Sequence, residues 1–425
     1  MSHQDHQQGR SQMDPSLVRG LTMARMSRRE LFRYAGVGVG ALGLSALLEA
    51  CGTKGVTSSG STAHASAGVG SQEWWAKQTL HHQLNFANWP YYIDTAHGKH
   101  PSIEQFEQKT GIQVNYTEPI DDNVTFYQSK LRPVLQAGQP TGYDIVVLTN
   151  NDWPLSQMME LGWLIPLNHD MMKNFDQYAS DLVKDPAWDP GNKYTMAWQS
   201  GYTCIGYNTK YVKEPVTSVQ ILWDEKYAGK IGIFANAGEL GSVGLLALGI
   251  DPATSTPDDW KKAAEKLQQQ KDAGIVRSYY DQDYIKALKN EDIWISQVWS
   301  GDVFQAATYQ GYPQLKIAIP DEGAMFWTDN MCIPLLAENP LDAMTYMDYV
   351  YDPQVQALIE DYNAYVCPVP AAKEIIAKQL KDPTVANSPT VFPDAHMQSL
   401  SRDYYQFKNN EELTEWNNLF VPIFQ

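Results

Sequence analysis

Two tryptophan–aspartate pairs stand on either side of a short apolar run in the sequence. The first pair is Trp299 and Asp302, within Trp-Ser-Gly-Asp, and the second is Trp327 and Asp329. The run between them, 315–320, has strand length, so we expect both pairs on loops at strand ends, lining one pocket. An indole face attracts a cation through its quadrupole, and a desolvated carboxylate pairs with the cation directly. This chemistry favours binding of an organic cation with an apolar body.

Taken alone, each pair more often has a structural role, as a core tryptophan followed by an aspartate in a turn. The rest of the chain must therefore decide between the two interpretations. With 425 residues, 43% of them hydrophobic, the chain is long enough for two globular domains. Its net charge of −17 argues against a nucleic-acid partner and fits a protein that attracts small cations.

The cysteines and the missing motifs exclude several kinds of chemistry. Cys51, Cys204, Cys332 and Cys367 show no C-x-x-C spacing of the kind found in metal sites. The last three leave room for one disulfide, whose pairing the sequence does not determine. The sequence contains neither the G-x-S-x-G nor the H-E-x-x-H motif of hydrolases, so an exported hydrolase is the least favoured function. We expect no metal, no cofactor and no catalytic residue.

The first 51 residues look like an export signal. A twin arginine, Arg28 and Arg29, precedes a short apolar stretch at 34–48, which resembles a twin-arginine signal. The stretch ends in Leu-Glu-Ala-Cys, which resembles a lipobox with Cys51 as the lipidated residue, although Glu49 is unusual in that motif. The alternative is an uncleaved anchor helix. Residues 52–78 are expected to form a flexible tether, because the stretch is rich in Gly, Ser, Thr and Ala.

The body of the chain alternates strand-length apolar runs with helical stretches. Strands are predicted at 84–88, 113–116 and 143–148, with helices at 103–110 and 125–135 between them. This alternation is typical of a parallel sheet, in which ligands bind beyond the carboxyl ends of the strands. Further strands are predicted at 202–208, which is expected to cross between two lobes, and at 230–234, 293–298 and 330–334.

Five markers in order resemble the spermidine/putrescine-binding proteins of bacterial ABC transporters, over about 82–393. They are Asn88-Trp89, the strand from Tyr143 to Val147, the Trp-Ser-Gly-Asp motif, Phe326 to Asp329, and Tyr365 to Pro370. The resemblance implies an α/β fold of the two-lobed, periplasmic-binding-protein type (type II), with a ligand cleft between lobes joined by crossing strands. It places lobe 1 at 79–204 and 330–372, and lobe 2 at 205–329 and 373–425.

The same resemblance implies eight ligand-binding residues: Trp89, Tyr92, Thr149, Glu239, Trp299, Trp327, Asp329 and Tyr365. The aromatic residues would enclose the polyamine chain, and the Thr149 hydroxyl would bind the ligand. Asp329 would hold one terminal ammonium, and Glu239 would lie toward the other end of the ligand. Each also has a structural alternative. Glu239, for example, could be a helix N-terminal acid, stabilised by the dipole without a ligand.

Two further positions are weaker candidates. Asn236 stands where spermidine binders have an aspartate, which removes one negative charge from the site. Asp302 could supply a carboxylate, or could form a salt bridge within the protein. A buried ammonium without a partner is costly, so the remaining acids favour a dication over a trication.

Together these features predict a receptor without catalytic activity. It would be anchored through Cys51 to the outer face of the cell membrane, capture putrescine or spermidine, and deliver it to an ABC transporter permease. We expect it to act as a monomer. The alternative is the same receptor fold with another amine-bearing ligand, such as an amino acid or γ-aminobutyrate.

Overall fold

The computed structural model describes residues 68–425, so Arg28, Arg29, Cys51 and the rest of the predicted signal lie outside the described part. Three parallel strands form one half of its sheet: β1 (Gln83–Ala87), β2 (Gln113–Thr117) and β3 (Ile145–Thr149). Helix α4 (Pro101–Thr110) connects β1 to β2 and ends at Gly111, whose φ of 74° is a left-handed conformation that glycine adopts without strain. The predicted strand–helix alternation is confirmed here.

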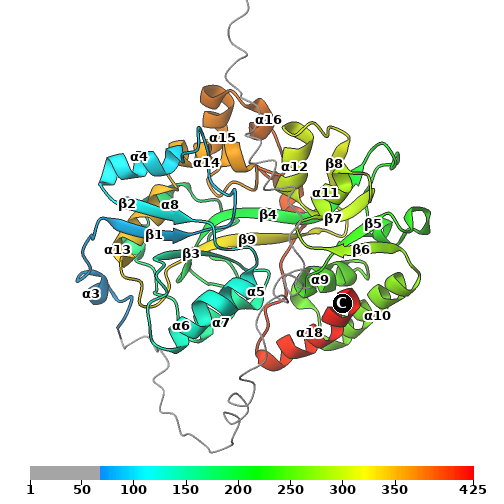
Figure 1. Ribbon diagram of the computed structural model, residues 1–425, viewed down its shortest axis with the longest axis horizontal. Helices are drawn as coiled ribbons and strands as arrows, with labels where there is room; N and C mark the ends of the chain where they lie inside the picture. Colours follow the sequence, from blue (N-terminus) through cyan, green and yellow to red (C-terminus); the bar gives the residue numbers. More distant parts are fainter. Residues whose placement is uncertain (1–67) are drawn as a thin grey trace, which may run out of the picture. The chain divides into compact units, whose positions relative to one another are not determined.

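Two long antiparallel strands continue the sheet from this half into the other. Strand β4 (Thr195–Asn208) pairs with β9 (Ala324–Cys332) along most of its length, and β9 also pairs with β3. Near its carboxyl end β4 also pairs with β7 (Ile295–Trp299), so it belongs to both halves. Figure 1 shows β4 and β9 side by side across the middle of the molecule.

The second half of the sheet is again parallel. Strand β5 (Ile231–Phe234) lies between β7 and β6 (Val276–Tyr280). The strand order is β2-β1-β3-β9-β4-β7-β5-β6. Two short strands join its central members: β8 (Leu315–Ala318) pairs with β4, and β10 (Ser401–Arg402) pairs with β9.

Helices cover the sheet on both sides (Figure 1). Those before β4 are α3 (Gln72–Trp75), α4, α5 (Asn123–Phe126), α6 (Arg132–Gln136), α7 (Trp153–Glu160) and α8 (Lys173–Tyr178). Those between β5 and β8 are α9 (Ala237–Leu246), α10 (Pro257–Asp272), α11 (Tyr284–Lys289) and α12 (Ser300–Thr308). Those after β9 are α13 (Pro340–Tyr349), α14 (Pro353–Asn363), α15 (Ala372–Ile375), α16 (Pro383–Ala386), α17 (Ala395–Ser399) and α18 (Asn410–Phe424).

The buried apolar residues gather in separate clusters on the two halves of the sheet. The largest cluster contains Phe86, Val146 and Met331 from β1, β3 and β9. A second contains Ile233 of β5 together with residues of α9, α10 and α18, among them Trp260. A third, smaller cluster contains Tyr202 of β4, Val298 of β7 and Phe326 of β9. The lobe boundaries given above stay a prediction.

Two local expectations were wrong. Trp327 and Asp329 do not lie on a loop before a separate strand at 330–334, because β9 runs unbroken through all of them. The predicted tether ends before residue 78, because α3 buries Trp75, whose indole nitrogen donates to the Pro166 carbonyl at 3.1 Å.

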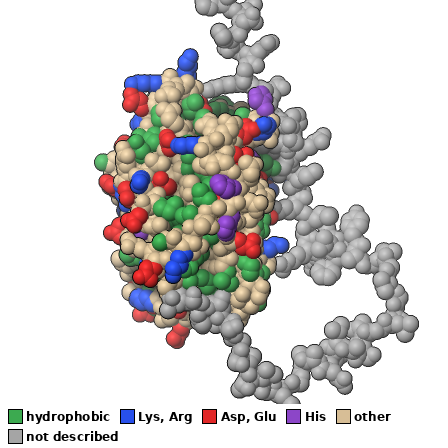
Figure 2. Space-filling view, turned by 90° about the vertical axis from the view of Figure 1, so that its left-hand side faces the viewer, with side chains coloured by type: hydrophobic (Ala, Val, Ile, Leu, Met, Phe, Trp, Pro, Cys, Tyr) green, Lys and Arg blue, Asp and Glu red, His purple; other side chains and the backbone are tan. Residues whose placement is uncertain are grey.

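Cys204, Cys332 and Cys367 are all buried free thiols, so the disulfide for which the sequence left room is not formed among them. Within residues 68–425, none of the helices is long and apolar enough to cross a bilayer. On the face drawn in Figure 2, acidic and basic side chains are interspersed, with hydrophobic side chains scattered between them.

Candidate ligand-binding site

Asp329 lies at the centre of the predicted site, in the middle of β9. The register of β3 and β9 places Thr149 directly opposite, and its Oγ1 donates to Asp329 Oδ1 at 2.5 Å. The Tyr92 hydroxyl donates to the other carboxylate oxygen at 2.7 Å. Only 6% of Asp329 is exposed. Burial raises its pKa to about 6, although the two hydroxyl hydrogen bonds act in the opposite direction.

Aromatic rings from distant parts of the chain surround this carboxylate. The Tyr365 ring makes edge contacts with Tyr92 and Trp327, with centroid distances of 5.5 and 5.4 Å. The Trp327 indole lies against Gly201 of β4, where a Cβ atom would be only 2.3 Å from the ring. The indole can therefore occupy this position only because Gly201 has no Cβ atom. Tyr365 lies in the same way against Gly301, where the distance would be 2.6 Å.

Asp302 is joined to this group through Tyr365. It lies in the first turn of α12, not in a turn between strands, and accepts from the Tyr365 hydroxyl at 2.9 Å and the Tyr284 hydroxyl at 2.6 Å. Burial raises its pKa. The salt bridge considered for Asp302 is not present among residues 68–425, since its close partners are hydroxyls. Trp299, at the end of β7, stacks on Phe234 with centroids 5.0 Å apart.

Glu239 forms a second centre in the first turn of α9. Its Oε1 accepts from Tyr404 at 2.7 Å, Thr203 at 3.1 Å and Asn151 at 3.3 Å. Its Oε2 has no hydrogen-bond partner in the described part of the chain, and the residue is only 2% exposed. Burial raises the pKa of Glu239 to about 7. Asn236 caps α9 by accepting from the Glu239 backbone amide at 3.0 Å.

Trp89 is the predicted residue that the structure connects least to the others. It is half-buried in the loop after β1, three residues before Tyr92. Its indole nitrogen has no hydrogen-bond partner within residues 68–425. The structure thus links seven of the eight predicted residues through hydrogen bonds, ring contacts or strand pairing, while Trp89 shares only the loop of Tyr92.

The three buried carboxylates form no ion pair with a basic side chain in the described part of the chain. Asp329, Glu239 and Asp302 belong to none of the ion pairs within residues 68–425, which involve other acids. Lys289 acts on Asp302 only through a weaker, longer-range attraction. A buried carboxylate without a positive partner is costly to ionise. The arrangement is therefore suited to an external cation, which would supply the missing charge.

Sequence reasoning missed three residues that contact these acids: Tyr404, Tyr284 and Thr203. Tyr404 lies in the tail after residue 393, and Tyr284 begins α11, so neither belongs to the motifs that identified the site. The one available signal for Tyr404 was the abundance of aromatic residues in that tail. Thr203 lies within β4, for which the sequence predicted only a crossing between the lobes.

The chain is also similar to known proteins. The family model described as "bacterial extracellular solute-binding protein" matches residues 102–393. The spermidine/putrescine-binding periplasmic protein of Escherichia coli (strain K12) is 28% identical over 313 residues, which cover 73% of this chain and 83% of that protein. The putrescine-binding periplasmic protein PotF of the same organism is 29% identical over 332 residues, covering 74% of this chain and 84% of PotF.

A solved structure shows the same fold. The spermidine/putrescine ABC transporter substrate-binding protein PotD of Streptococcus pneumoniae matches with a TM-score of 0.68 at 24% identity, over 80% of this chain and 98% of that one. This likeness confirms the two-lobed α/β fold predicted from the sequence. The resemblance to spermidine/putrescine-binding proteins is confirmed as well, and the chain belongs to the family of bacterial extracellular solute-binding proteins.

Proposed function

We propose that this protein captures a polyamine, putrescine or spermidine, between its two lobes and delivers it to an ABC importer. The observation that carries the proposal is the environment of Asp329, which is buried, held by two hydroxyls and enclosed by aromatic rings, and which belongs to no ion pair within residues 68–425. A primary ammonium would supply the absent positive charge. The methylene chain of a polyamine would lie against the rings of Trp327 and Tyr365.

The separate hydrogen-bond partners of the two acids support a ligand with charges at both ends. Asp329 lies on β9 and Glu239 on α9, and each has its own set of hydroxyl donors. Tyr92 and Thr149 can rotate their hydroxyls, so they can remain beside Asp329 when an ammonium arrives. One terminal ammonium would bind Asp329, and the other would bind the unpartnered Oε2 of Glu239.

The names of the relatives support the same ligand class, since two of them are called spermidine/putrescine-binding and putrescine-binding proteins. Export through a twin-arginine signal and lipid attachment at Cys51 remain part of the proposal, and rest on the sequence of the first 51 residues. A receptor tethered in this way would stay close to its permease. We expect binding and release without chemical change of the ligand, and a monomeric protein.

Calorimetric titration of the chain from residue 68 onward tests the proposal. The protein is unfolded, dialysed and refolded to remove bound ligand, and titrated with putrescine, spermidine and γ-aminobutyrate. We expect a dissociation constant of micromolar or below for one polyamine, corresponding to about −8 kcal/mol or better, and none comparable for γ-aminobutyrate. Tighter binding of γ-aminobutyrate would favour an amino-acid receptor. Absence of heat with every amine would contradict the proposed ligand class.

A further inference from the structure

A hollow of about 620 Å³ lies beside Glu239, because Gly238 and Asn151, which contact that residue, are part of its lining. The loop after β3 contributes Asn151 and Asp152 to its lining, and the start of α9 contributes Asn236 and Gly238. Helix α18 forms another wall. The hollow is therefore lined by residues from both halves of the sheet, and it belongs to the region where a ligand held between them would extend.

Two asparagines connect the hollow to Glu239. Asn151 lines the hollow and donates to Glu239 Oε1 at 3.3 Å. Asn236 caps the helix of Glu239 with its Oδ1 and donates with its Nδ2 to Asp152 Oδ2 at 3.3 Å. Asp152 is therefore joined to Glu239 through the Asn236 side chain.

The Asp152 carboxylate accepts from the Asn236 amide, and neither a helix cap nor an ion pair within residues 68–425 accounts for its charge. It stands at the N-cap of α7, yet its side chain makes no capping hydrogen bond to that helix. It belongs to none of the ion pairs within residues 68–425. Burial raises the pKa of Asp152 to about 7, and repulsion from Asp122 and Glu239 contributes in the same direction. Its ionised form would be stabilised by a cation in the hollow.

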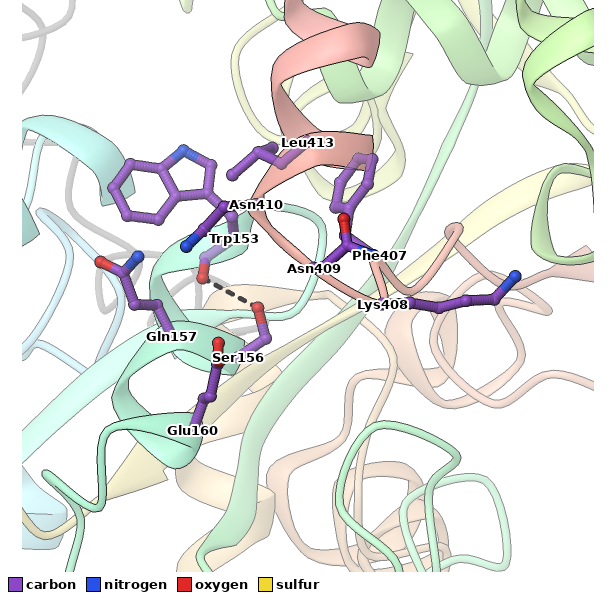
Figure 3. Close-up of a pocket in the computed structure, with 9 residues that line it drawn as sticks. All are labelled: Trp153, Ser156, Gln157, Glu160, Phe407, Lys408, Asn409, Asn410 and Leu413. Atoms are coloured by element: carbon purple, nitrogen blue, oxygen red, sulfur yellow. Dashed lines mark hydrogen bonds between the residues drawn. The ribbon is translucent and has the colours of Figure 1, made fainter.

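The walls of the hollow suit an apolar chain between charges. Aromatic side chains line it, among them Trp153, Phe407 and Trp416. A smaller pocket of about 200 Å³ shares Trp153 and Phe407 with it. Figure 3 shows this smaller pocket between α7 and the start of α18, with Leu413 near the Trp153 indole and Lys408 extending away from it. The one basic side chain drawn there is thus turned away from the aromatic wall.

We propose that Asp152 binds a third ammonium group and that the hollow receives the distal segment of a triamine or tetraamine. This inference rests on the proposed function and specifies its ligand class. The carboxylate that the sequence lacks at Asn236 is supplied from the facing loop, where Asp152 meets the Asn236 amide. The acid missing at position 236 by itself favoured a dication, and Asp152 would replace its charge from the opposite side of the hollow. Arg132 also lines the hollow, and its positive charge would repel an ammonium group bound there.

The test is a set of calorimetric titrations of the ligand-free protein with putrescine, spermidine and spermine. Asp152→Asn keeps the shape of the side chain and removes its charge. We expect this variant to lose at least tenfold in spermidine and spermine affinity, with the putrescine affinity changed by less than threefold. Arg132→Gln, which removes a like charge from the same hollow, should raise the affinity for both longer amines relative to putrescine.

Glu265→Gln is the matched control, because Glu265 is an exposed acid on α10 outside the hollow, so its loss removes one charge at a distance. It should leave all three affinities unchanged. Suppose that the unaltered protein binds polyamines. If Asp152→Asn then lowers the affinity for all three amines equally, or for none of them, the role of Asp152 is refuted while the proposed function stands. If Asp152→Asn fails to fold, an unchanged amine preference in Arg132→Gln refutes the role. If the unaltered protein binds no polyamine, the proposed function fails and the inference with it.

Discussion

Thr149 and Asp329 stand directly opposite each other on the antiparallel strands β3 and β9, and the Thr149 hydroxyl donates to the Asp329 carboxylate at 2.5 Å. Strand pairing thus fixes the position of the acid from both sides, because β9 also pairs with β4 at Gln199. The carboxylate is part of the rigid sheet and not of a mobile loop. A ligand bound to it is held at the strands that join the two halves of the molecule.

Replacing Asp329 with Asn should abolish most of the ligand affinity. The Asn side chain keeps the size and can still accept from Thr149 or Tyr92, but it offers no negative charge to an ammonium. Removing one partner of a buried charge pair costs about 2 kcal/mol or more, which corresponds to at least about 30-fold in affinity. Titration with the preferred polyamine measures the change, and a circular dichroism spectrum checks the fold. Unchanged affinity would remove Asp329 from the site.

Replacing Glu239 with Gln should change stability and binding in opposite directions. The amide avoids a buried, partly unpartnered negative charge, so the ligand-free protein should melt at a higher temperature. The same change removes the proposed partner of the second ammonium, so putrescine should bind more weakly. Thermal denaturation with and without putrescine shows both effects. A fall in stability together with normal binding would identify Glu239 as a purely structural acid.

The raised pKa values predict how the stability of the ligand-free protein depends on pH. The folded protein holds protons on Asp329 and Glu239 up to about pH 6 and 7, whereas the unfolded chain loses them near 4. Between these values the folded state binds more protons, so its stability falls as pH rises from about 4 to about 7. For Glu239 alone the loss is on the order of 3 kcal/mol. Melting curves across this range measure the slope, which Glu239→Gln should reduce.

Polyamine binding should show the reverse dependence. Ligand amines keep their charge up to about pH 10, so the carboxylates decide the affinity below pH 8. Affinity should rise as pH increases through 6 to 7, and binding near pH 6.5 should release protons. Titrations in buffers with different ionisation enthalpies count the protons. Affinity that is constant from pH 5 to 8 would contradict the assignment of these acids to the ligand.

Gly201 should not tolerate a side chain. A Cβ atom there would lie 2.3 Å from the Trp327 ring, so Gly201→Ala should push the indole out of place and cost about 1–3 kcal/mol of stability. Ligand affinity should fall with it. Combining the change with Trp327→Phe, whose smaller ring relieves the contact, should recover part of the stability, as denaturant unfolding of the single and double variants would show. Additive losses would mean that the two positions are not coupled.

Much of this arrangement can be predicted from the sequence. Runs of strand length separated by helical stretches predict the parallel strands β1, β2 and β3, of which β3 is buried along its whole length. The aromatic and acidic residues at 299–302 and 326–329 predict a cation site, and the structure joins Asp329, Trp327 and Asp302 through Tyr92 and Tyr365.

Other parts have no signal in the sequence. Strand β9 is buried along its whole length between β3 and β4, so its residues do not alternate, and Asp329 within it looks like a loop residue. Tyr404 and Tyr284 contact the acids only because the tertiary fold brings them together. Tyr404 and Glu239, for example, are 165 residues apart in the sequence. The helix α3 is fixed by Trp75 bonding to Pro166, which local composition at 72–75 does not indicate.

A crystal structure of residues 68–425 with bound putrescine tests the central claim most directly. The account predicts one ammonium nitrogen within hydrogen-bond distance of Asp329, beside the hydroxyls of Tyr92 and Thr149. The second ammonium should lie at Glu239 Oε2, with the methylene chain against Trp327. If putrescine occupied another place and Asp329 kept only its two hydroxyl partners, the assignment of this site would be wrong.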